Sequence, residues 1–242
     1  MNNNELSIFI ATHKQFDDSI FPNKSIYTIL STDSNFKSSN HNVIYISNTF
    51  TKYWKEQYSE GAHMHYLYTH SNLINDYIVF YHYRRYFINF INNENKIIEL
   101  INKYKCIVVE PEQSFWGTKG KLLNNINEAL HVNFDENSIN IIKNIIEIDY
   151  PEIFPVYLYY ISSNKFYNRN IFAMKKNDFL EMCIFVFDIL NKYKLYNDKE
   201  NYCIFGTYRF YAYLLEHLTC LFYLYKFGTN LYTERLNRAC WA

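Results

Sequence analysis

The fold is decided by the stretch Tyr77-Ile-Val-Phe-Tyr-His-Tyr-Arg-Arg-Tyr-Phe87, in which a short apolar run ends abruptly in basic residues. Tyr77 to His82 has the aromatic and β-branched composition of a buried strand, and Arg84 and Arg85 follow at its tip. Cations gathered at a strand end indicate a pocket for an anion. Phosphate fits best, because the guanidinium fork binds its oxygens in a bidentate geometry. The alternative is that both arginines pair with carboxylates or lie in solvent.

Three more strands are predicted before this stretch, at Leu6 to Ala11, Ser25 to Leu30 and Val43 to Ser47. A helix is predicted from Trp54 to His70, which lacks proline and has aromatic residues at helical intervals. Strands joined by a helical crossover favour an α/β sheet with parallel neighbours. Ligands then bind at the carboxyl ends of the strands, where the strand order reverses.

A second polar strand end, Thr12-His13-Lys14, follows the first strand. If the strand order is 3-2-1-4, the first and fourth strands are adjacent, and these residues face His82, Arg84 and Arg85 across the crevice. Two basic strand ends that converge on one place indicate a phosphate or diphosphate site. A different strand order would keep them apart.

The second half of the chain is predicted to be richer in helix. Strands are predicted at Cys106 to Val109 and Asn170 to Lys175, and helices at Asn137 to Ile148, Pro151 to Ile161 and Asn177 to Lys192. No linker rich in Gly, Ser or Pro divides the chain, so we expect one continuous α/β domain over residues 1–242.

The last predicted helix, within Tyr208 to Phe227, is apolar on almost every side, which is typical of a buried helix. Glu216 and His217 interrupt the apolar run, so a core helix is expected rather than a membrane span. A buried carboxylate is unfavourable unless a cation or a hydrogen-bond donor meets it. Glu216 is therefore either half of a structural ion pair or a working carboxylate near the site.

Composition excludes several classes of protein. The chain has 24 Lys and Arg residues against 24 Asp and Glu residues, so no overall charge draws it to nucleic acid or an acidic membrane. The five cysteines are scattered and lack the paired spacing of a zinc site. The first residues run straight into a strand without a signal-peptide pattern, so a cytoplasmic protein is expected.

Several motifs occur in the order in which one known family has them: Thr12-His13-Lys14, Tyr58-Ser-Glu60, His82-Tyr-Arg-Arg-Tyr-Phe87, Asn170-Ile-Phe-Ala-Met-Lys175, and Arg209 with Leu215-Glu216. On these residues the chain, from roughly residue 6 to residue 226, resembles the DUF4422 family of capsular and exopolysaccharide biosynthesis glycosyltransferases. The run that begins at His82 is the most specific of these motifs. The resemblance implies a GT-A-like fold, which is a Rossmann-type mixed sheet flanked by helices with a helix-rich C-terminal half.

The resemblance also implies a function. It implies a hexosyltransferase that moves a sugar from a nucleotide-diphosphate sugar, with UDP as the expected nucleotide, to a growing capsular or other surface glycan, free or lipid-linked. Some relatives are thought to transfer galactofuranose, which leaves UDP-galactofuranose as one option. Residues 1–110 would bind the nucleotide sugar and residues 111–242 would face the acceptor. We expect no nucleic-acid partner and at most peripheral contact with the inner face of the membrane. The sequence is compatible with a monomer and with a homo-oligomer.

Many GT-A enzymes hold a divalent metal with an Asp-x-Asp motif at the end of the fourth strand, where this chain has His82-Tyr83-Arg84. A hard cation without carboxylate ligands is not expected there, so neither a metal nor another cofactor is predicted beyond the donor itself. We expect cations to stabilise the departing nucleoside diphosphate instead. The residues expected to act at the donor are His82, Thr12, His13, Lys14, Glu60, Arg84, Arg85, Asn170 and Arg209.

The acceptor hydroxyl needs a base, for which Glu216 is the first candidate and Glu60 the second. Glu60 could instead bind donor hydroxyls or cap its helix, and Arg209 could hold Glu216 or a donor phosphate. Asn170 could contact the acceptor or be a turn residue. The histidines at positions 63, 65 and 70 lack the acid or cysteine that would complete a metal site.

One segment departs from the family, because Asn42 to Phe50 replaces its usual Gly-Asp-Asn-Ile-Ser-like sequence. The resemblance therefore does not extend to the donor preference or to any activity that depends on that loop. Two other functions stay open: a non-catalytic anion-binding or RNA-binding module that stacks bases on Tyr83, Tyr86 and Phe87, and a silent relative that binds a glycan. The zero net charge argues against RNA.

Overall fold

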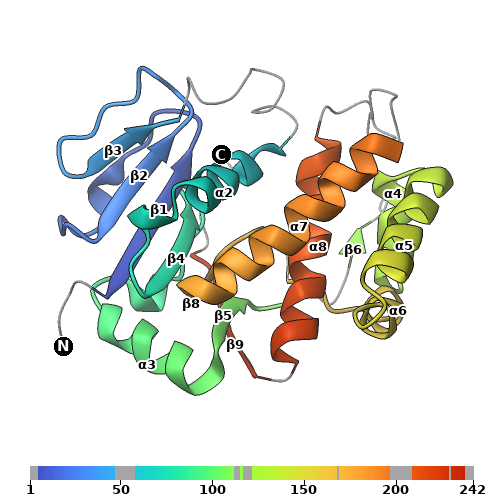
Figure 1. Cartoon of the computed structure of the whole chain (residues 1–242). Helices are drawn as coiled ribbons and strands as arrows, with labels where there is room; N and C mark the ends of the chain where they lie inside the picture. The colour runs from blue at the N-terminus through green and yellow to red at the C-terminus, as the bar shows by residue number, and fades with distance from the viewer. Residues whose placement is uncertain are drawn as a thin grey trace.

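The computed structural model describes residues 5–46, 58–111, 115–116, 122–167, 169–196, 209–228 and 230–237. The four strands predicted in the first half are present as β1 (Leu6–Thr12), β2 (Tyr27–Ser31), β3 (Asn42–Tyr45) and β4 (Tyr77–His82). Within the described ranges they belong to a seven-stranded sheet with the order β3-β2-β1-β4-β8-β5-β9 (Figure 1). The structure thus has the order 3-2-1-4 on which the predicted convergence of the two basic strand ends depends, and these four strands pair in parallel.

The sheet is mixed, as the predicted fold class requires. β8 (Phe172–Lys175) lies between β4 and β5 (Cys106–Val109) and runs antiparallel to both, while β9 (Leu231–Glu234) runs parallel to β5. The register pairs Phe80 with Phe172, so the amino end of β8 lies beside the carboxyl end of β4. Residues just before β8 thus share one edge of the sheet with His82.

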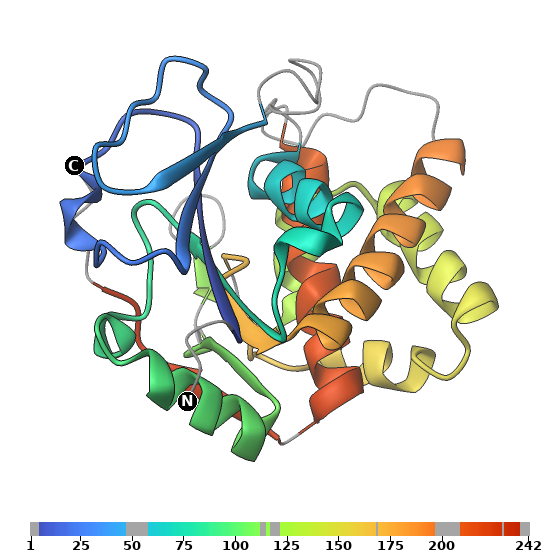
Figure 2. The same ribbon diagram turned by 60° about the vertical axis from the view of Figure 1, so that its left-hand side comes forward.

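Helices cover both faces of the sheet. On one face α3 (Glu94–Tyr104) buries four apolar side chains against the strands, and Figure 2 shows this helix across the sheet from the longer helices α7 and α8. On the other face lie α2 (Glu60–Thr69), α7 (Lys176–Tyr196) and α8 (Phe210–Phe227). Alternate residues of each strand enter the two cores, as the two-residue period of a strand requires.

The helix-rich half is completed by three helices that pack around α7 and α8: α4 (Ile126–Asn133), α5 (Glu136–Asp149) and α6 (Phe154–Ser162) (Figure 1). A short two-stranded ribbon, β6 (Phe115–Trp116) with β7 (Leu122–Leu123), precedes them. The predicted helices correspond to α5, α6 and α7, within a few residues at each end. α3, α4 and β9 were not predicted.

The core position predicted for the last helix is confirmed, because most residues of α8 are buried. No helix in the described ranges is long and apolar enough to cross a bilayer. The helix predicted from Trp54 to His70 is present as Glu60–Thr69, and positions 54–57 lie outside the described residues, as does Ser47. Three cysteines, Cys106, Cys183 and Cys220, are free and buried, and the other two fall outside the described ranges.

Candidate active site

A cavity lies at the carboxyl ends of β1 and β4, beside the amino end of α2. This is the place in the sheet where the strand order reverses, which is where doubly wound folds bind their ligands. Its empty volume is about 820 Å³. The residues that line it are Ala11, Thr12, His13, Thr32, Ser59, Glu60, His63, His82, Arg84 and Arg209.

Thr12 is the last residue of β1, and two hydrogen bonds fix it, one within the turn that follows and one from the helix α2. Its hydroxyl donates to the backbone oxygen of Lys14 at 2.6 Å. The Nε2 of His63 on α2 donates to the backbone oxygen of Thr12 at 3.2 Å. Burial lowers the pKa of His63 to about 4, so this imidazole is neutral near pH 7 and acts as a hydrogen-bond donor that fixes the strand end.

The basic motif after β4 is held as a tight turn. The backbone N–H of Arg85 donates to the oxygen of His82 at 2.8 Å, and the N–H of His82 donates to the oxygen of Arg85 at 3.1 Å. At its tip the Arg84 guanidinium lies over the buried ring of Tyr83, 5.1 Å from the centroid. Lys14 lies 5.7 Å from the same centroid. The backbone hydrogen bonds of this turn and the contact with the Tyr83 ring thus hold Arg84 at the cavity, which Thr12 also lines.

Glu60 is bound by His82 across the floor of the cavity, with 3.1 Å between His82 Nε2 and Glu60 Oε1. Burial alone would raise the pKa of Glu60, but the hydrogen bond and charge of His82 outweigh it and hold this pKa well below its usual value. Arg209 lies on the other side, with its Nη2 4.0 Å from Glu60 Oε2 and donating to the Ser59 hydroxyl at 3.2 Å. Glu60 is therefore ionised and is a weak base.

Glu216 does not line the cavity; it lies on α8, which packs tightly on α2. A Cβ added to Gly61 would lie only 2.6 Å from Leu215 Cδ1, and the rings of Tyr58 and Tyr211 stack at 4.9 Å. Burial and the nearby charge of Glu60 raise the pKa of Glu216 to about 7. Arg209, Arg85 and Arg169 oppose that rise. Glu216 is therefore poised to gain or lose a proton near neutral pH.

Residues 7–226 match the family described as Domain of unknown function, DUF4422. The chain belongs to the DUF4422 family. No curated protein matches the chain. A solved structure described as the apo structure of the bifunctional glycosyltransferase WbbM is similar, with a TM-score of 0.69 over 96% of this chain at 20% sequence identity. This chain spans 45% of that protein. The predicted family and the GT-A-like mixed α/β fold are thus confirmed for this DUF4422 chain.

Three of the predicted donor residues do not line the cavity. Lys14 lies beside Tyr83, and Arg85 is half-buried, with its pKa lowered by burial and by the charges of Arg169 and Arg84. Asn170 is buried, and its Oδ1 accepts a hydrogen bond from the Thr219 hydroxyl at 3.1 Å. This bond and its positive φ of 48° favour the turn-residue interpretation of Asn170 over a ligand contact.

Several residues at the site were not predicted: Thr32, Ser59 and His63 in the cavity lining, and Arg169, whose charge opposes the rise in the pKa of Glu216. His63 follows Glu60 by three positions and so lies on the same face of the helix. This spacing can be read from the sequence and would have indicated that His63 lies at the site. Arg169 precedes the strand predicted from residue 170, but only the antiparallel placement of β8 brings it to this edge.

The described residues contain no group of three or more His, Cys, Asp and Glu side chains arranged to hold a metal ion. In the cavity itself Glu60 binds His82, while His63 binds the backbone of Thr12.

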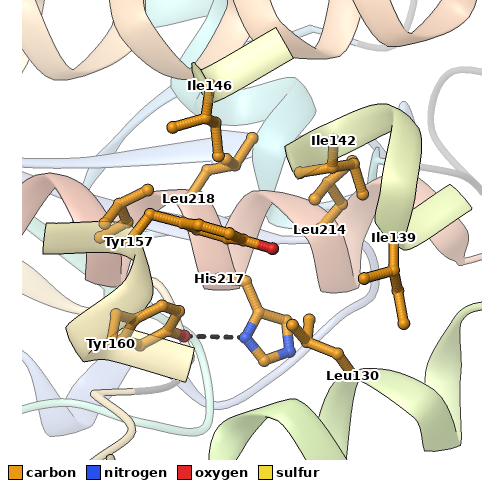
Figure 3. Close-up of a pocket in the computed structure, with 10 residues that line it drawn as sticks. Leu130, Ile139, Ile142, Ile146, Tyr157, Tyr160, Leu214, His217 and Leu218 are labelled. Carbon is orange, nitrogen blue, oxygen red and sulfur yellow. Dashed lines mark hydrogen bonds between the residues drawn. The ribbon is translucent and has the colours of Figure 1, made fainter. Parts of the chain in front are cut away.

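A second cavity lies among α4, α5, α6 and α8, with an empty volume of about 340 Å³ (Figure 3). Leucine and isoleucine side chains form most of its wall, and the polar pair Tyr160 and His217 is hydrogen-bonded at 2.8 Å between the hydroxyl and Nδ1. Burial lowers the pKa of His217 to about 3, so this histidine is neutral. This cavity carries no charge that could bind a phosphate and belongs to the apolar core.

Proposed function

We propose that this DUF4422 protein is a glycosyltransferase that moves a hexosyl group from a nucleotide-diphosphate sugar, with UDP as the nucleotide, to a surface glycan. One observation carries the proposal: His13, His82, Arg84 and Arg209 gather around one cavity at the reversal of strand order. The helix α8, which carries Glu216, packs on α2. The fold shared with a glycosyltransferase supports it. The choice of a capsular or exopolysaccharide acceptor, of UDP and of galactofuranose as one donor option rests on the resemblance described above.

The donor diphosphate would lie between the two basic strand ends. Negative charge accumulates on the leaving diphosphate as the glycosidic bond breaks, so cations fixed in place stabilise the transition state more than the ground state. Arg84 and Arg209 supply guanidinium groups, and the bond between Glu60 and His82 holds the imidazole in position. In this proposal these groups take the role that a divalent metal has in many enzymes of this fold.

Glu216 would activate the acceptor. In a single displacement, an acceptor hydroxyl oxygen attacks the anomeric carbon, the bond from that carbon to the diphosphate oxygen breaks, and the hydroxyl proton passes to Glu216. A pKa of about 7 suits this role, since a base is most effective when its pKa lies near the working pH. The low pKa of Glu60 makes it the weaker candidate for the proton.

The donor half would then comprise residues 1–110, and the acceptor would approach from the helix-rich half, residues 111–242, which carries Glu216. We propose that the transfer takes place in the cytoplasm, at the inner face of the membrane when the acceptor is lipid-linked.

A panel of nucleotides and nucleotide sugars tests this function, with thermal shift as the binding readout and nucleotide release as the activity readout. We expect one nucleoside diphosphate to raise the melting temperature, the matching sugar donor to be hydrolysed or transferred, and a metal chelator to change neither result. Failure of every nucleotide to bind would refute the proposal. RNA binding that weakens steeply with salt would favour the non-catalytic module instead.

A further inference from the structure

Ser59, the residue before α2, has a backbone conformation that a side chain makes unfavourable. Its φ is 49° and its ψ is −121°. Glycine adopts this region freely, whereas the Cβ of serine makes it strained. Such strain persists only where the surrounding structure enforces it, and it occurs preferentially at functional sites. Ser59 also lines the cavity at the carboxyl ends of β1 and β4, so the strain lies at the proposed donor site.

The Ser59 hydroxyl does not have the role that serine usually has before a helix. Serine is a preferred N-cap residue, because its hydroxyl accepts a hydrogen bond from an N–H group of the first turn. In α2, as far as the structure describes it, the Ser59 side chain makes no such bond. Its Oγ instead accepts a hydrogen bond from Nη2 of Arg209 at 3.2 Å. The hydroxyl thus faces a cation that lines the same cavity.

The same hydroxyl is hydrogen-bonded to Glu60, the next residue. Burial raises the pKa of Glu60, while hydrogen bonds from His82 and from the Ser59 hydroxyl lower it. The direct distance from Arg209 Nη2 to Glu60 Oε2 is 4.0 Å, which is too long for a hydrogen bond. Ser59 bridges this gap, since its oxygen accepts from Arg209 and its O–H donates to the ionised carboxylate.

A continuous relay of hydrogen bonds therefore crosses the cavity, from Arg209 through Ser59 and Glu60 to His82. Arg209 depends on such support, because its side chain is 48% exposed and a long exposed side chain has many rotamers. Its guanidinium carbon also lies 5.7 Å from the ring centroid of Tyr213, which is a weak contact at an exposed site. The hydrogen bond to Ser59 is thus the contact that fixes the direction of the guanidinium.

We propose that Ser59 is a positioning residue whose hydroxyl holds the Arg209 guanidinium toward the donor diphosphate. This inference rests on the proposed glycosyl transfer and adds Ser59 to the residues that serve it. The strained backbone accompanies the role, since Ser59 begins a helix and yet directs its hydroxyl to Arg209 and Glu60 instead of the helix N–H groups. A guanidinium fixed in advance loses less side-chain entropy when the diphosphate binds, and it is in place when charge develops on the leaving group.

Two variants separate the hydroxyl from the strain, because Ser59→Ala and Ser59→Gly both remove the hydroxyl and only glycine relieves the backbone. We expect Ser59→Gly to have a higher melting temperature than Ser59→Ala, and both to bind UDP about 10-fold more weakly than the wild type. Lys105→Gly is the matched control, since Lys105 has a φ of 70° and follows α3 on the opposite face of the sheet. It should keep the wild-type UDP affinity. Wild-type affinity in both Ser59 variants overturns the proposal.

A double-mutant cycle tests whether Ser59 acts through Arg209. In the Arg209→Ala background, Ser59→Ala should weaken UDP binding by no more than about 2-fold further. Losses that add in full would show that Ser59 acts on the donor by another route and would overturn its role in positioning Arg209.

The relay is also tested without a nucleotide, by a carbon-13 NMR titration of the Glu60 carboxyl group. We expect the pKa of Glu60 to be higher in Ser59→Ala than in the wild type and unchanged in Lys105→Gly, because only the former loses a hydrogen bond to the carboxylate. An unchanged pKa in Ser59→Ala overturns the relay. If no nucleoside diphosphate binds the wild type, the proposed function fails, and this titration still decides the relay.

Discussion

At the scale of single residues, Glu60 and Glu216 are two carboxylates of one site whose surroundings move their pKa values in opposite directions. His82 keeps Glu60 ionised, whereas burial raises the pKa of Glu216 to about 7. Such a divergence separates a charge that positions from a group that transfers a proton. We expect turnover to fall as the pH drops below about 7, because Glu216 is then protonated and cannot accept the acceptor proton.

Glu216→Gln should lower kcat by about 10²-fold to 10⁴-fold and remove that acidic limb of the pH profile, while UDP binding stays intact. Glu110→Gln is a matched control, since Glu110 is half-exposed and pairs with Arg235. An unchanged pH profile in Glu216→Gln would show that another group takes the proton.

The same residue predicts a dependence of stability on pH. The ordinary pKa of the Glu216 carboxyl is 4.5, and it rises to about 7 in the folded protein. Above pH 4.5 the carboxyl of Glu216 loses its proton in the unfolded chain but keeps it in the folded protein. The contribution of Glu216 to the free energy of unfolding therefore declines between pH 4.5 and about pH 7, and above about pH 7 it stays constant at its lowest value. Glu216→Gln should therefore stabilise the protein at about pH 8, on the order of 2 kcal/mol, and have a much smaller effect at about pH 4. Equal unfolding free energies of the two proteins at about pH 8 would contradict the raised pKa of Glu216.

A site residue could be predicted from the sequence when the residues next to it in the chain indicate its place in the fold. Thr12 and Arg84 were predicted because each directly follows an apolar run, and the cavity brings them together. Arg169 could not be predicted from the same signal, because it precedes a strand and depends on the direction of β8. The burial that sets the pKa of Glu216 depends on α2, which is distant in the sequence.

At the scale of elements, the site depends on the close approach of α2 and α8 at Gly61. Gly61→Ala should destabilise the protein by about 1–3 kcal/mol, since the new Cβ would lie 2.6 Å from Leu215 Cδ1. It should also lower activity, because α2 carries Glu60 and α8 carries Glu216. A double-mutant cycle with Leu215→Ala, followed by chemical denaturation, checks this contact. The cost of Gly61→Ala should largely disappear in the Leu215→Ala background, and strictly additive effects would show that the helices do not meet there.

The succession of strands and helices along the chain was predicted better than the pairing of the strands in the sheet. Periodicity and apolar runs predicted most of the strands and helices. The order of the first four strands was one of the orders left open, namely that of a doubly wound sheet, and the structure has it. They did not predict that β8 inserts antiparallel between β4 and β5, because that pairing is set by packing over a long sequence separation. α3 was not predicted, although its buried residues Ile97, Ile98, Leu100 and Ile101 recur at helical spacing.

At the scale of the whole molecule, the charge is balanced but unevenly placed. Equal numbers of acidic and basic residues give no net charge, yet cationic side chains gather at one edge of the sheet. The fold explains this, since parallel β1 and β4 end side by side and antiparallel β8 begins there. We therefore expect a small polyanion to bind at this one place, and we expect no general attraction to nucleic acid.

The central claim is that fixed cations at the ends of β1 and β4 stabilise a departing nucleoside diphosphate. The most direct measurement is nucleotide release from the preferred donor by Arg84→Ala and by the control Arg235→Ala, each with its melting temperature and UDP affinity. The account predicts that Arg84→Ala loses about 10²-fold or more in kcat with an unchanged melting temperature, while Arg235→Ala keeps its rate. Wild-type turnover by Arg84→Ala would contradict it.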